Sequence, residues 1–218
     1  HLAVGTPAAT PSLSQVEQTL AGVGIELSGL QFKESEVWGE TRFIANAPDG
    51  SSVSVEVIGR DATDARLFAK VWRSIWYKDS GAAISLSRTH QLEHRAYLLL
   101  LAERAGIPVS DVVVAGTGGP RDTAVLVLHE PAGTRLTRVE PPAITDAVLD
   151  DAWRNLCTLH EARVAHGTMR AASVLLRADG TTAFVDFGHA SADAPAERCQ
   201  LDSVGLLVTT AALIGDER

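Results

Sequence analysis

Apolar and polar positions near the start of the chain follow first a helical and then a strand-like pattern. Apolar residues recur at helical spacing within 12–24, behind Ser and Pro residues that favour a helix start. Positions then alternate along 27–47 and 51–59, and the turn sequence Ala47-Pro-Asp-Gly50 separates these two stretches. The pattern predicts a short amphipathic helix followed by β-hairpins.

The middle of the chain returns to helical spacing. Residues 62–77 carry an apolar and aromatic stripe, which we interpret as core packing, and 87–105 predicts a longer helix that ends at Gly106. Two strands are expected at 109–115 and 123–129, with a glycine-rich turn between them.

A loop rich in Pro and Gly over 130–142 precedes a change to helical composition, which begins with a helix predicted at 145–163. A domain boundary is expected here. The sequence therefore divides into a linker or terminal tail at 1–12, a β-rich part at 13–131 and a helical part at 132–218.

Composition narrows the range of functions. The chain has 218 residues with 45% hydrophobic content, enough for one substantial core or two small lobes. The net charge of −8 and the lack of a basic run argue against a nucleic-acid partner. No apolar run reaches the roughly 18 residues needed to span a bilayer. Cys157 and Cys199 lack disulfide or metal spacing, so we expect a reducing compartment and interpret both as buried or bystander thiols.

Two short segments in the C-terminal half carry the candidate chemistry. The first runs from His166-Gly167 to Ser173, and the second is Val185-Asp186-Phe187-Gly188. They resemble the catalytic loop H-G/R-D-x-x-x-x-N and the metal loop D-F-G of kinases, in which the first Asp is the base and the Asn and the second Asp hold magnesium. In this register Thr168 occupies the base position and Ser173 the Asn position. Asp186 is retained as the candidate magnesium ligand.

A structural role is expected for the residues around these positions. Asp186 is predicted to lie at the tip of a short hairpin. Asp202, on the apolar helix that follows, is expected to support the backbone of the catalytic-like loop, or alternatively to cap that helix. The other positions assigned a structural role are His166, Gly167, Phe187 and Gly188.

The phosphate-pairing positions are changed as well. A kinase places a Lys on its third strand and a Glu on the following long helix. Glu56 stands at the Lys position, and Glu93 is the retained helix Glu, with a plain surface acid as its alternative. The two acids would repel one another unless one turns to solvent, they share a proton, or a cation such as Arg60 or Lys70 intervenes. Lys70 is otherwise interpreted as a solvated helix charge.

The phosphate-covering loop is weak. Residues 33–40 contain a single glycine, Gly39, and three acids, so the segment repels ATP rather than cradling it. The glycines of 116–119 are interpreted as a hairpin turn. Only weak binding of Mg-ATP, and no required cofactor, is therefore expected in a cleft lined by Gly39, Glu56, His129 and Asp186.

Two other site types fit the sequence less well. The spacing of His160, His166 and His189 matches no compact zinc-ligand pattern. Ser173 and Ser203 lack the G-x-S-x-G context of a nucleophilic serine.

From about 27 to 214 the chain resembles kinase-like domains of the aminoglycoside-phosphotransferase and lipopolysaccharide-kinase type. In particular, it is similar to those attached to integral membrane proteins of the lysylphosphatidylglycerol-synthase or flippase-like type in actinobacteria. The resemblance implies an α+β, bilobal protein-kinase-like fold with a β-rich N-lobe and a truncated helical C-lobe. That family usually has Lys where Glu56 stands and Asp where Thr168 stands. The matching segments, besides the two loops, are 53–61, 67–77 and 91–94.

These departures favour a pseudokinase, a regulatory module without phosphate transfer. Its partner is expected to be a protein or the membrane-embedded remainder of a parent chain, which implies a cytoplasmic, membrane-associated location. The alternative is an atypical small-molecule or protein phosphotransferase, in which Asp186 binds magnesium and Glu56 or Glu93 substitutes for the missing groups. A third reading is a soluble structural domain with an inert cleft.

Overall fold

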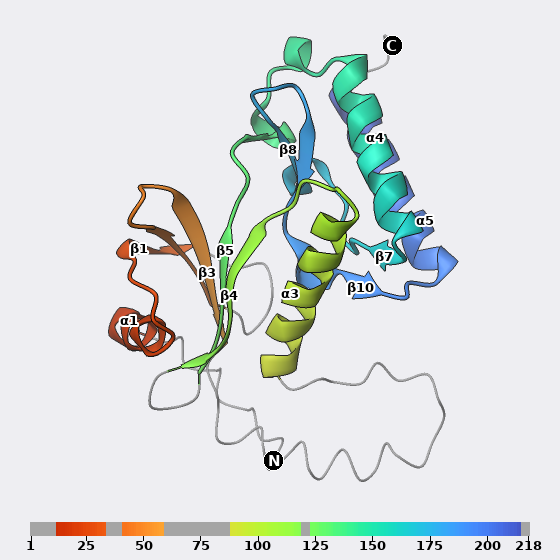
Figure 1. The fold of residues 1–218 in the computed structure, drawn as a ribbon. Coiled ribbons are helices and arrows are strands. Elements are labelled where there is room, and N and C mark those ends of the chain that lie inside the picture. Colours follow the sequence, from red (N-terminus) through yellow and green to blue (C-terminus); the bar gives the residue numbers. More distant parts are fainter. Residues whose placement is uncertain (1–11, 34–40, 59–87, 119–122, 215–218) are drawn as a thin grey trace, which may run out of the picture. The chain divides into compact units, whose positions relative to one another are not determined.

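The computed structural model describes residues 12–33, 41–58, 88–118 and 123–214. The chain divides into two compact units. Unit 1 comprises His1–Glu93 and Val114–Val127, and unit 2 comprises His94–Val113 and Leu128–Arg218. Figure 1 shows the elements of both units.

Unit 1 is built on a five-stranded sheet with the order β1-β2-β3-β5-β4, and β1, β2 and β3 pair antiparallel in sequence order. A helix, α1, precedes the sheet. The Ser12 side chain caps this helix by accepting a hydrogen bond from the Gln15 N–H. The Gln15 side chain in turn accepts from the Ser12 N–H, which completes a capping box. The elements are α1 (Leu13–Gly22), β1 (Ser28–Lys33), β2 (Thr41–Asn46), β3 (Ser52–Ile58), β4 (Asp111–Gly118) and β5 (Thr123–His129).

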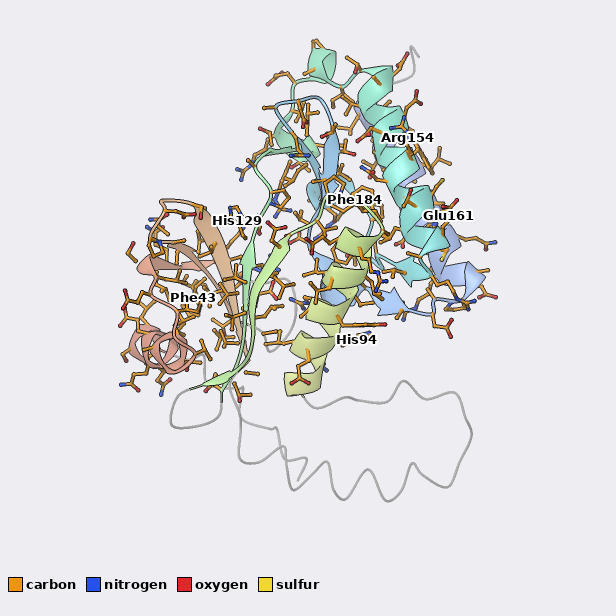
Figure 2. The ribbon with its side chains drawn as sticks, viewed as in Figure 1. Phe43, His94, His129, Arg154, Glu161 and Phe184 are labelled. Atoms are coloured by element: carbon orange, nitrogen blue, oxygen red, sulfur yellow. The ribbon has the colours of Figure 1, made fainter. Side chains whose placement is uncertain are left out.

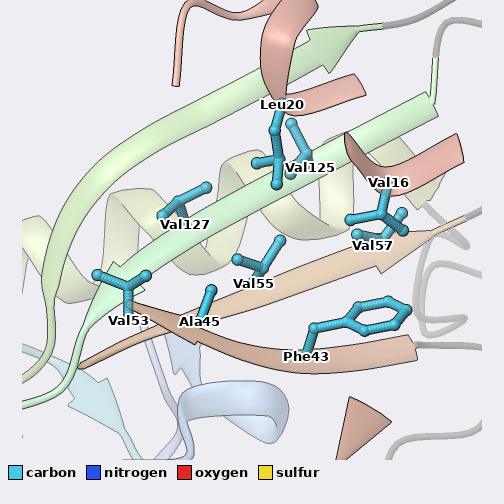
Figure 3. Close-up of a cluster of buried hydrophobic side chains, with 9 residues drawn as sticks. All are labelled: Val16, Leu20, Phe43, Ala45, Val53, Val55, Val57, Val125 and Val127. Carbon is cyan, nitrogen blue, oxygen red and sulfur yellow. The ribbon is translucent and has the colours of Figure 1, made fainter. Parts of the chain in front are cut away.

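The core of unit 1 lies between α1 and one face of the sheet (Figure 3). Because side chains alternate along a strand, the apolar positions of β3 share one face and its polar positions share the other. The apolar face packs beneath α1, while Ser54 and Glu56 lie on the opposite face. The buried cluster consists of Val16, Leu20, Phe43, Ala45, Val53, Val55, Val57, Val125 and Val127.

Unit 2 combines helices with two small sheets. One sheet has the order β6-β8-β9 and the other pairs β10 with β7, and α4 packs against α5 (Figure 1). The helices are α3 (Arg88–Arg104), which begins in unit 1, α4 (Asp146–Glu161) and α5 (Ala196–Ile214). The strands are β6 (Thr134–Arg135), β7 (Val164–Ala165), β8 (Val174–Leu176), β9 (Thr182–Phe184) and β10 (Ser191–Ala192).

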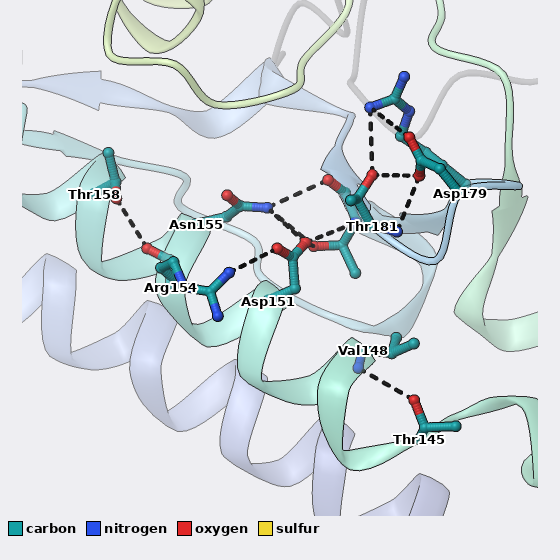
Figure 4. A network of polar contacts seen from close by, with 10 residues as sticks. Thr145, Val148, Asp151, Arg154, Asn155, Thr158, Asp179 and Thr181 are labelled. Carbon is teal, nitrogen blue, oxygen red and sulfur yellow. Dashed lines mark hydrogen bonds and ion pairs between the residues drawn. The ribbon is translucent and has the colours of Figure 1, made fainter.

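A polar network fixes α4 to the β8–β9 hairpin (Figure 4). Thr145 caps α4 by accepting from the Val148 N–H. One carboxylate oxygen of Asp151 accepts from the N–H and the hydroxyl of Thr182, at 2.7 and 2.8 Å, and Asn155 donates to the Thr182 carbonyl at 3.2 Å. The helix and the hairpin that leads to Asp186 therefore hold a fixed register.

Several predicted elements are confirmed. The helix at 12–24, the strands around the Ala47–Gly50 turn and the helices at 87–105 and 145–163 all occur, with ends shifted by a few residues. Each unit also buries a large aromatic ring, Phe43 in the first and Phe184 in the second (Figure 2).

Other expectations are wrong. Gly116 and Gly118 lie within β4 rather than in a turn. The 130–142 segment is not only a loop, because it contains β6 and two 3-10 helices, Leu136–Arg138 and Pro141–Ala143. Cys157 is exposed, so of the two interpretations given for it, buried or bystander thiol, only the bystander thiol fits.

Two further expectations concern the helix predicted in the middle of the chain and membrane-spanning segments. The helix predicted at 62–77 lies outside the described residues, together with Arg60 and Lys70. Within the residues that the structure describes, no helix is long and apolar enough to cross a membrane.

Candidate functional site

The catalytic-like loop runs from β7 to β8 and is held by a carboxylate of α5. Asp202 accepts from the backbone N–H of His166 at 2.6 Å and from that of Gly167 at 2.9 Å. It is 2% exposed and lies well inside α5, which begins at Ala196, so it does not cap that helix. Sequence analysis expected this carboxylate beside the loop, and the structure places it there.

The charge of Asp202 is stabilised in place. Burial alone would raise its pKa, but the nearby His160 side chain and the backbone N–H groups of His166 and Gly167 hold the pKa below its ordinary value of 3.8. His160 Nε2 lies 3.5 Å from Asp202 Oδ2, at the outer limit of a hydrogen bond. The side chain of Asp202 is thus an ionised carboxylate.

His166 is a fully buried, neutral ring. Its Nε2 lies 2.8 Å from the Val185 carbonyl, and its Nδ1 faces the Thr168 N–H at 3.4 Å. These partners require a donor at Nε2 and an acceptor at Nδ1, which is the neutral Nε2–H tautomer. Burial lowers the pKa of His166 from 6.5, against the opposing effects of Val185 and Asp202. The ring also meets the edge of Phe187, with centroids 4.9 Å apart.

Gly167 is required by the shape of this loop. Its φ of +85° lies in the left-handed region, and a Cβ at this position would overlap the backbone carbonyl of His189. Both features exclude a side chain. Gly167 therefore allows the catalytic-like loop to pass close to the short 3-10 helix Phe187–His189 that follows Asp186. This helix includes Gly188, the last residue of the Asp-Phe-Gly sequence.

The two residues that the sequence predicts at the base and Asn positions, Thr168 and Ser173, both carry hydroxyl groups. Ser173 is fully buried, and its hydroxyl donates to the Thr168 carbonyl at 3.0 Å. The Ser173 side chain is thus used to close the loop on itself. Thr168 is partly buried, and its side chain has no carboxylate that could accept a proton.

Asp186 is paired with an arginine. The Nη1 atom of Arg135 lies 2.6 Å from Asp186 Oδ2, and both side chains are about one-fifth exposed. Asp186 has a left-handed backbone, with φ of +66° and ψ of +49°, and it starts the 3-10 helix Phe187–His189. It lies beyond the end of β9 and not at the hairpin tip, which is formed by the Asp179–Gly180 turn.

Arg135 was not identified from the sequence. It belongs to 130–142, which the sequence predicts as a loop rich in Pro and Gly, and it is 51 residues from Asp186 along the chain. Its guanidinium also donates to the Ala172 carbonyl, and its Nη2 lies 3.7 Å from Glu130 Oε2. No local signal in the sequence points to this arrangement.

Unit 1 contains a second charged centre, on the polar face of β3. Glu56 is only 1% exposed, and its Oε1 accepts from Arg42 Nη2 at 2.7 Å. The two residues are direct cross-strand partners on β3 and β2. Arg42 is a cation that the described structure places at Glu56, while Arg60 and Lys70 lie outside the described residues. Glu93 is exposed on α3.

Arg42 could have been found from the sequence. Counting backward and forward from the Ala47–Gly50 turn pairs Asn46 with Ser52, and the same register pairs Arg42 with Glu56. An acid and a base directly opposite on one face of a hairpin form a favourable pair.

The remaining predicted residues do not gather into a further site. His129 is partly exposed, and its Nδ1 lies 3.6 Å from Asp111 Oδ2. Gly39 lies outside the described residues. Across the described ranges, no group of three or more His, Cys, Asp or Glu side chains could hold a metal ion.

Comparison with known proteins gives evidence on the fold. No family model matches the sequence, and no curated protein matches it. Among solved structures, the chain is similar to the Rio2 kinase from Chaetomium thermophilum, determined as an ADP/Mg2+-phosphoaspartate complex, with a TM-score of 0.56 and 14% sequence identity. The match covers 87% of this chain.

The chain has a protein-kinase-like fold. The α+β, protein-kinase-like fold with a β-rich sheet, which the sequence resemblance implies, is thereby confirmed. The chain spans 56% of the length of the Rio2 kinase chain. At 14% identity the likeness concerns the kinase-like fold alone.

Proposed function

We propose that the chain is a catalytically impaired kinase-like domain, a pseudokinase, which acts as a regulatory or partner-binding module. The observation that carries this proposal is the burial of Glu56 and its ion pair with Arg42. The sequence predicts Glu56 at the position of the phosphate-pairing lysine of a kinase-like fold. A carboxylate cannot attract a phosphate, and the arginine beside it is already used to neutralise that carboxylate.

The electrostatic consequence can be estimated. A lysine about 4 Å from a phosphate charge contributes about 4 kcal/mol at an effective dielectric constant near 20. Arg42 and Glu56 together are neutral, so this attraction is lost, although Arg42 removes most of the repulsion that Glu56 alone would cause. A loss of this size corresponds to roughly a thousandfold weaker nucleotide binding.

The catalytic-like loop supports the same proposal. A positioned general base typically accelerates a reaction by about 10²- to 10⁴-fold, and Thr168 offers none. Ser173 donates its hydroxyl to the Thr168 carbonyl, so the loop closes on itself. The contacts of Asp202 and His166 preserve the shape of the loop while its chemistry is missing.

Phosphate transfer from labelled ATP, with magnesium or manganese, tests the proposal. The full chain is compared with Asp186→Asn, using the chain itself and a generic protein and aminoglycoside as acceptors. We expect no transfer above the Asp186→Asn background. Transfer that is present in the wild type and lost in Asp186→Asn would overturn the proposal.

The alternative function is an atypical phosphotransferase that uses Mg-ATP weakly. Two observations favour it: Asp186 is retained, and the similar Rio2 kinase is described as a complex with ADP, Mg2+ and phosphoaspartate. Calorimetric titration with Mg-ATP separates the two functions. Saturable micromolar binding supports the alternative, whereas the pseudokinase proposal expects binding in the millimolar range or none.

We further propose that the module is the cytosolic part of a larger membrane protein. This proposal rests on the sequence resemblance to membrane-attached kinase-like domains. Carbonate extraction of membranes from the native organism, followed by detection with an antibody against residues 94–218, provides the test. Recovery of the antigen only in the fraction that carbonate releases would contradict it.

A further inference from the structure

Arg135 connects two carboxylates and a backbone carbonyl of unit 2. Its Nη1 donates to Asp186 Oδ2 and to the Ala172 carbonyl, and its Nη2 lies near Glu130 Oε2. One guanidinium therefore interacts with two carboxylates. It occupies the place that a cation bound by these two carboxylates would take. A planar fork with several donors suits this task better than an ammonium group.

The backbone around Arg135 holds the side chain in this position. Arg135 is the cross-strand partner of Leu175 in the β6–β8 pair. Gly133 makes the close approach of β6 possible, because a Cβ there would lie 2.8 Å from the Leu176 carbonyl oxygen. Arg135 thus enters the site from a paired strand and not from a free loop.

A divalent ion does not fit the residues that surround Asp186. One carboxylate oxygen of Asp186 already accepts from Arg135 at 2.6 Å. The residue at the usual second-ligand position, Ser173, donates its hydroxyl to the Thr168 carbonyl. Magnesium requires several oxygen ligands near octahedral geometry, and a guanidinium this close would repel it.

We propose that Arg135 is a built-in counter-ion that takes the place of the metal ion at Asp186. The inference deepens the proposed function and rests on it, since both concern the same loop. Arg135 is a positioning residue: it keeps Asp186 in its left-handed backbone conformation and ties it to the loop at Ala172. The loop keeps its shape without a divalent ion, and the site takes up a metal only when the guanidinium is removed.

Metal binding and thermal unfolding of the full chain test this proposal. Manganese is titrated by electron paramagnetic resonance, and melting temperatures are recorded with EDTA and with millimolar magnesium or manganese. The variants are Arg135→Met, Asp186→Asn and the double variant. Arg138→Met is the matched control, because Arg138 is an exposed arginine three residues away.

The wild type and Arg138→Met should show no saturable manganese binding and the same melting temperature in EDTA and in metal. Arg135→Met leaves Glu130 and Asp186 without their shared cation, so its melting temperature in EDTA should fall by about 3 to 6 °C. Manganese should bind this variant and restore the lost stability. Asp186→Asn and the double variant should not be restored by metal.

Two results would overturn the proposal. One is saturable manganese binding by the wild type that disappears in Asp186→Asn. The other is an Arg135→Met protein that folds but gains neither metal binding nor metal-dependent stability. The two proposals fail separately. If the wild type transfers phosphate but shows no metal-dependent stability, only the pseudokinase proposal is contradicted. If the wild type binds metal but transfers no phosphate, only the proposal for Arg135 is contradicted.

Discussion

Arg42 and Glu56 face each other directly across β2 and β3, with Nη2 and Oε1 2.7 Å apart and the carboxylate almost fully buried. A buried acid in a kinase-like N-terminal sheet is stable only when a cation accompanies it, because desolvation of an unpaired carboxylate is costly. The pair therefore explains how the sheet accommodates a glutamate where a lysine is expected.

Breaking this pair should destabilise unit 1 strongly. Arg42→Met leaves Glu56 buried without this partner, so we expect the free energy of unfolding to fall by about 3 to 5 kcal/mol. The double variant Arg42→Met, Glu56→Leu should lose much less, since neither charge remains. Urea unfolding followed by circular dichroism measures both.

Lys33 provides the control, because it is the cross-strand neighbour of Arg42 on β1. Lys33→Met should change the free energy of unfolding by less than about 1 kcal/mol. Equal losses in Arg42→Met and in the double variant would show that the charge pair is not what matters.

Asp202 should be essential to the catalytic-like loop. Asp202→Ala leaves the N–H groups of His166 and Gly167 without their acceptor, and we expect a loss of about 2 to 4 kcal/mol in the free energy of unfolding. Ser203→Ala is the control on the same helix, since the Ser203 hydroxyl only donates to the Cys199 carbonyl of its own helix.

The Asp202 effect should also depend on pH. The folded-state pKa of Asp202 lies below 3.8, so its contribution is complete above the unfolded pKa and disappears as the pH falls through the folded pKa. The difference between wild type and Asp202→Ala should therefore shrink in strong acid. A constant difference down to the acid transition would argue against a charged Asp202.

His166 should lower the stability of the protein in mild acid. Its pKa is lowered by burial, so the unfolded chain binds a proton more readily than the folded one, and stability falls as the pH drops below 6.5. His166→Gln keeps a polar side chain without a titrating ring and should flatten this dependence. Melting temperatures across the neutral to mildly acidic range provide the measurement, and parallel curves for the two proteins would contradict the prediction.

Local sequence rules predicted the parts of the fold that depend on neighbouring residues. Alternation and the Ala47–Gly50 turn predicted the β2–β3 hairpin, capping signals predicted the start of α1, and helical composition predicted α4. The loop that contains His166 and the Asp186 segment were found from short motifs, because the residues that define each motif are close together in the sequence. The kinase-like fold followed from the order of these elements and from the motif resemblance.

Contacts between distant segments could not be predicted in the same way. Arg135 reaches Asp186 because β6 pairs with β8, and the two-residue β6 has no pattern that reveals this pairing. The hairpin register alone pairs Glu56 with Arg42. The cations named from the sequence, Arg60 and Lys70, lie later in the chain. A carboxylate that is withdrawn from solvent requires a cation beside it. This requirement does not show which residue of the chain supplies the cation.

Gly167 and Gly180 form a matched pair for the last prediction. Both have left-handed backbones, with φ of +85° and +81°, so alanine is strained at either position. At Gly180, in the β8–β9 turn, an added Cβ meets no atom within 4 Å, and we expect Gly180→Ala to cost about 1 to 2 kcal/mol. At Gly167 the Cβ would also overlap the His189 carbonyl, so the loop must move away from the segment that follows Asp186. Gly167→Ala should therefore cost clearly more than Gly180→Ala in urea unfolding and should alter the amide chemical shifts of His166 and His189. Equal costs for the two variants would mean that backbone strain alone, and not the packing of the loop against residues 187–189, makes glycine necessary at position 167.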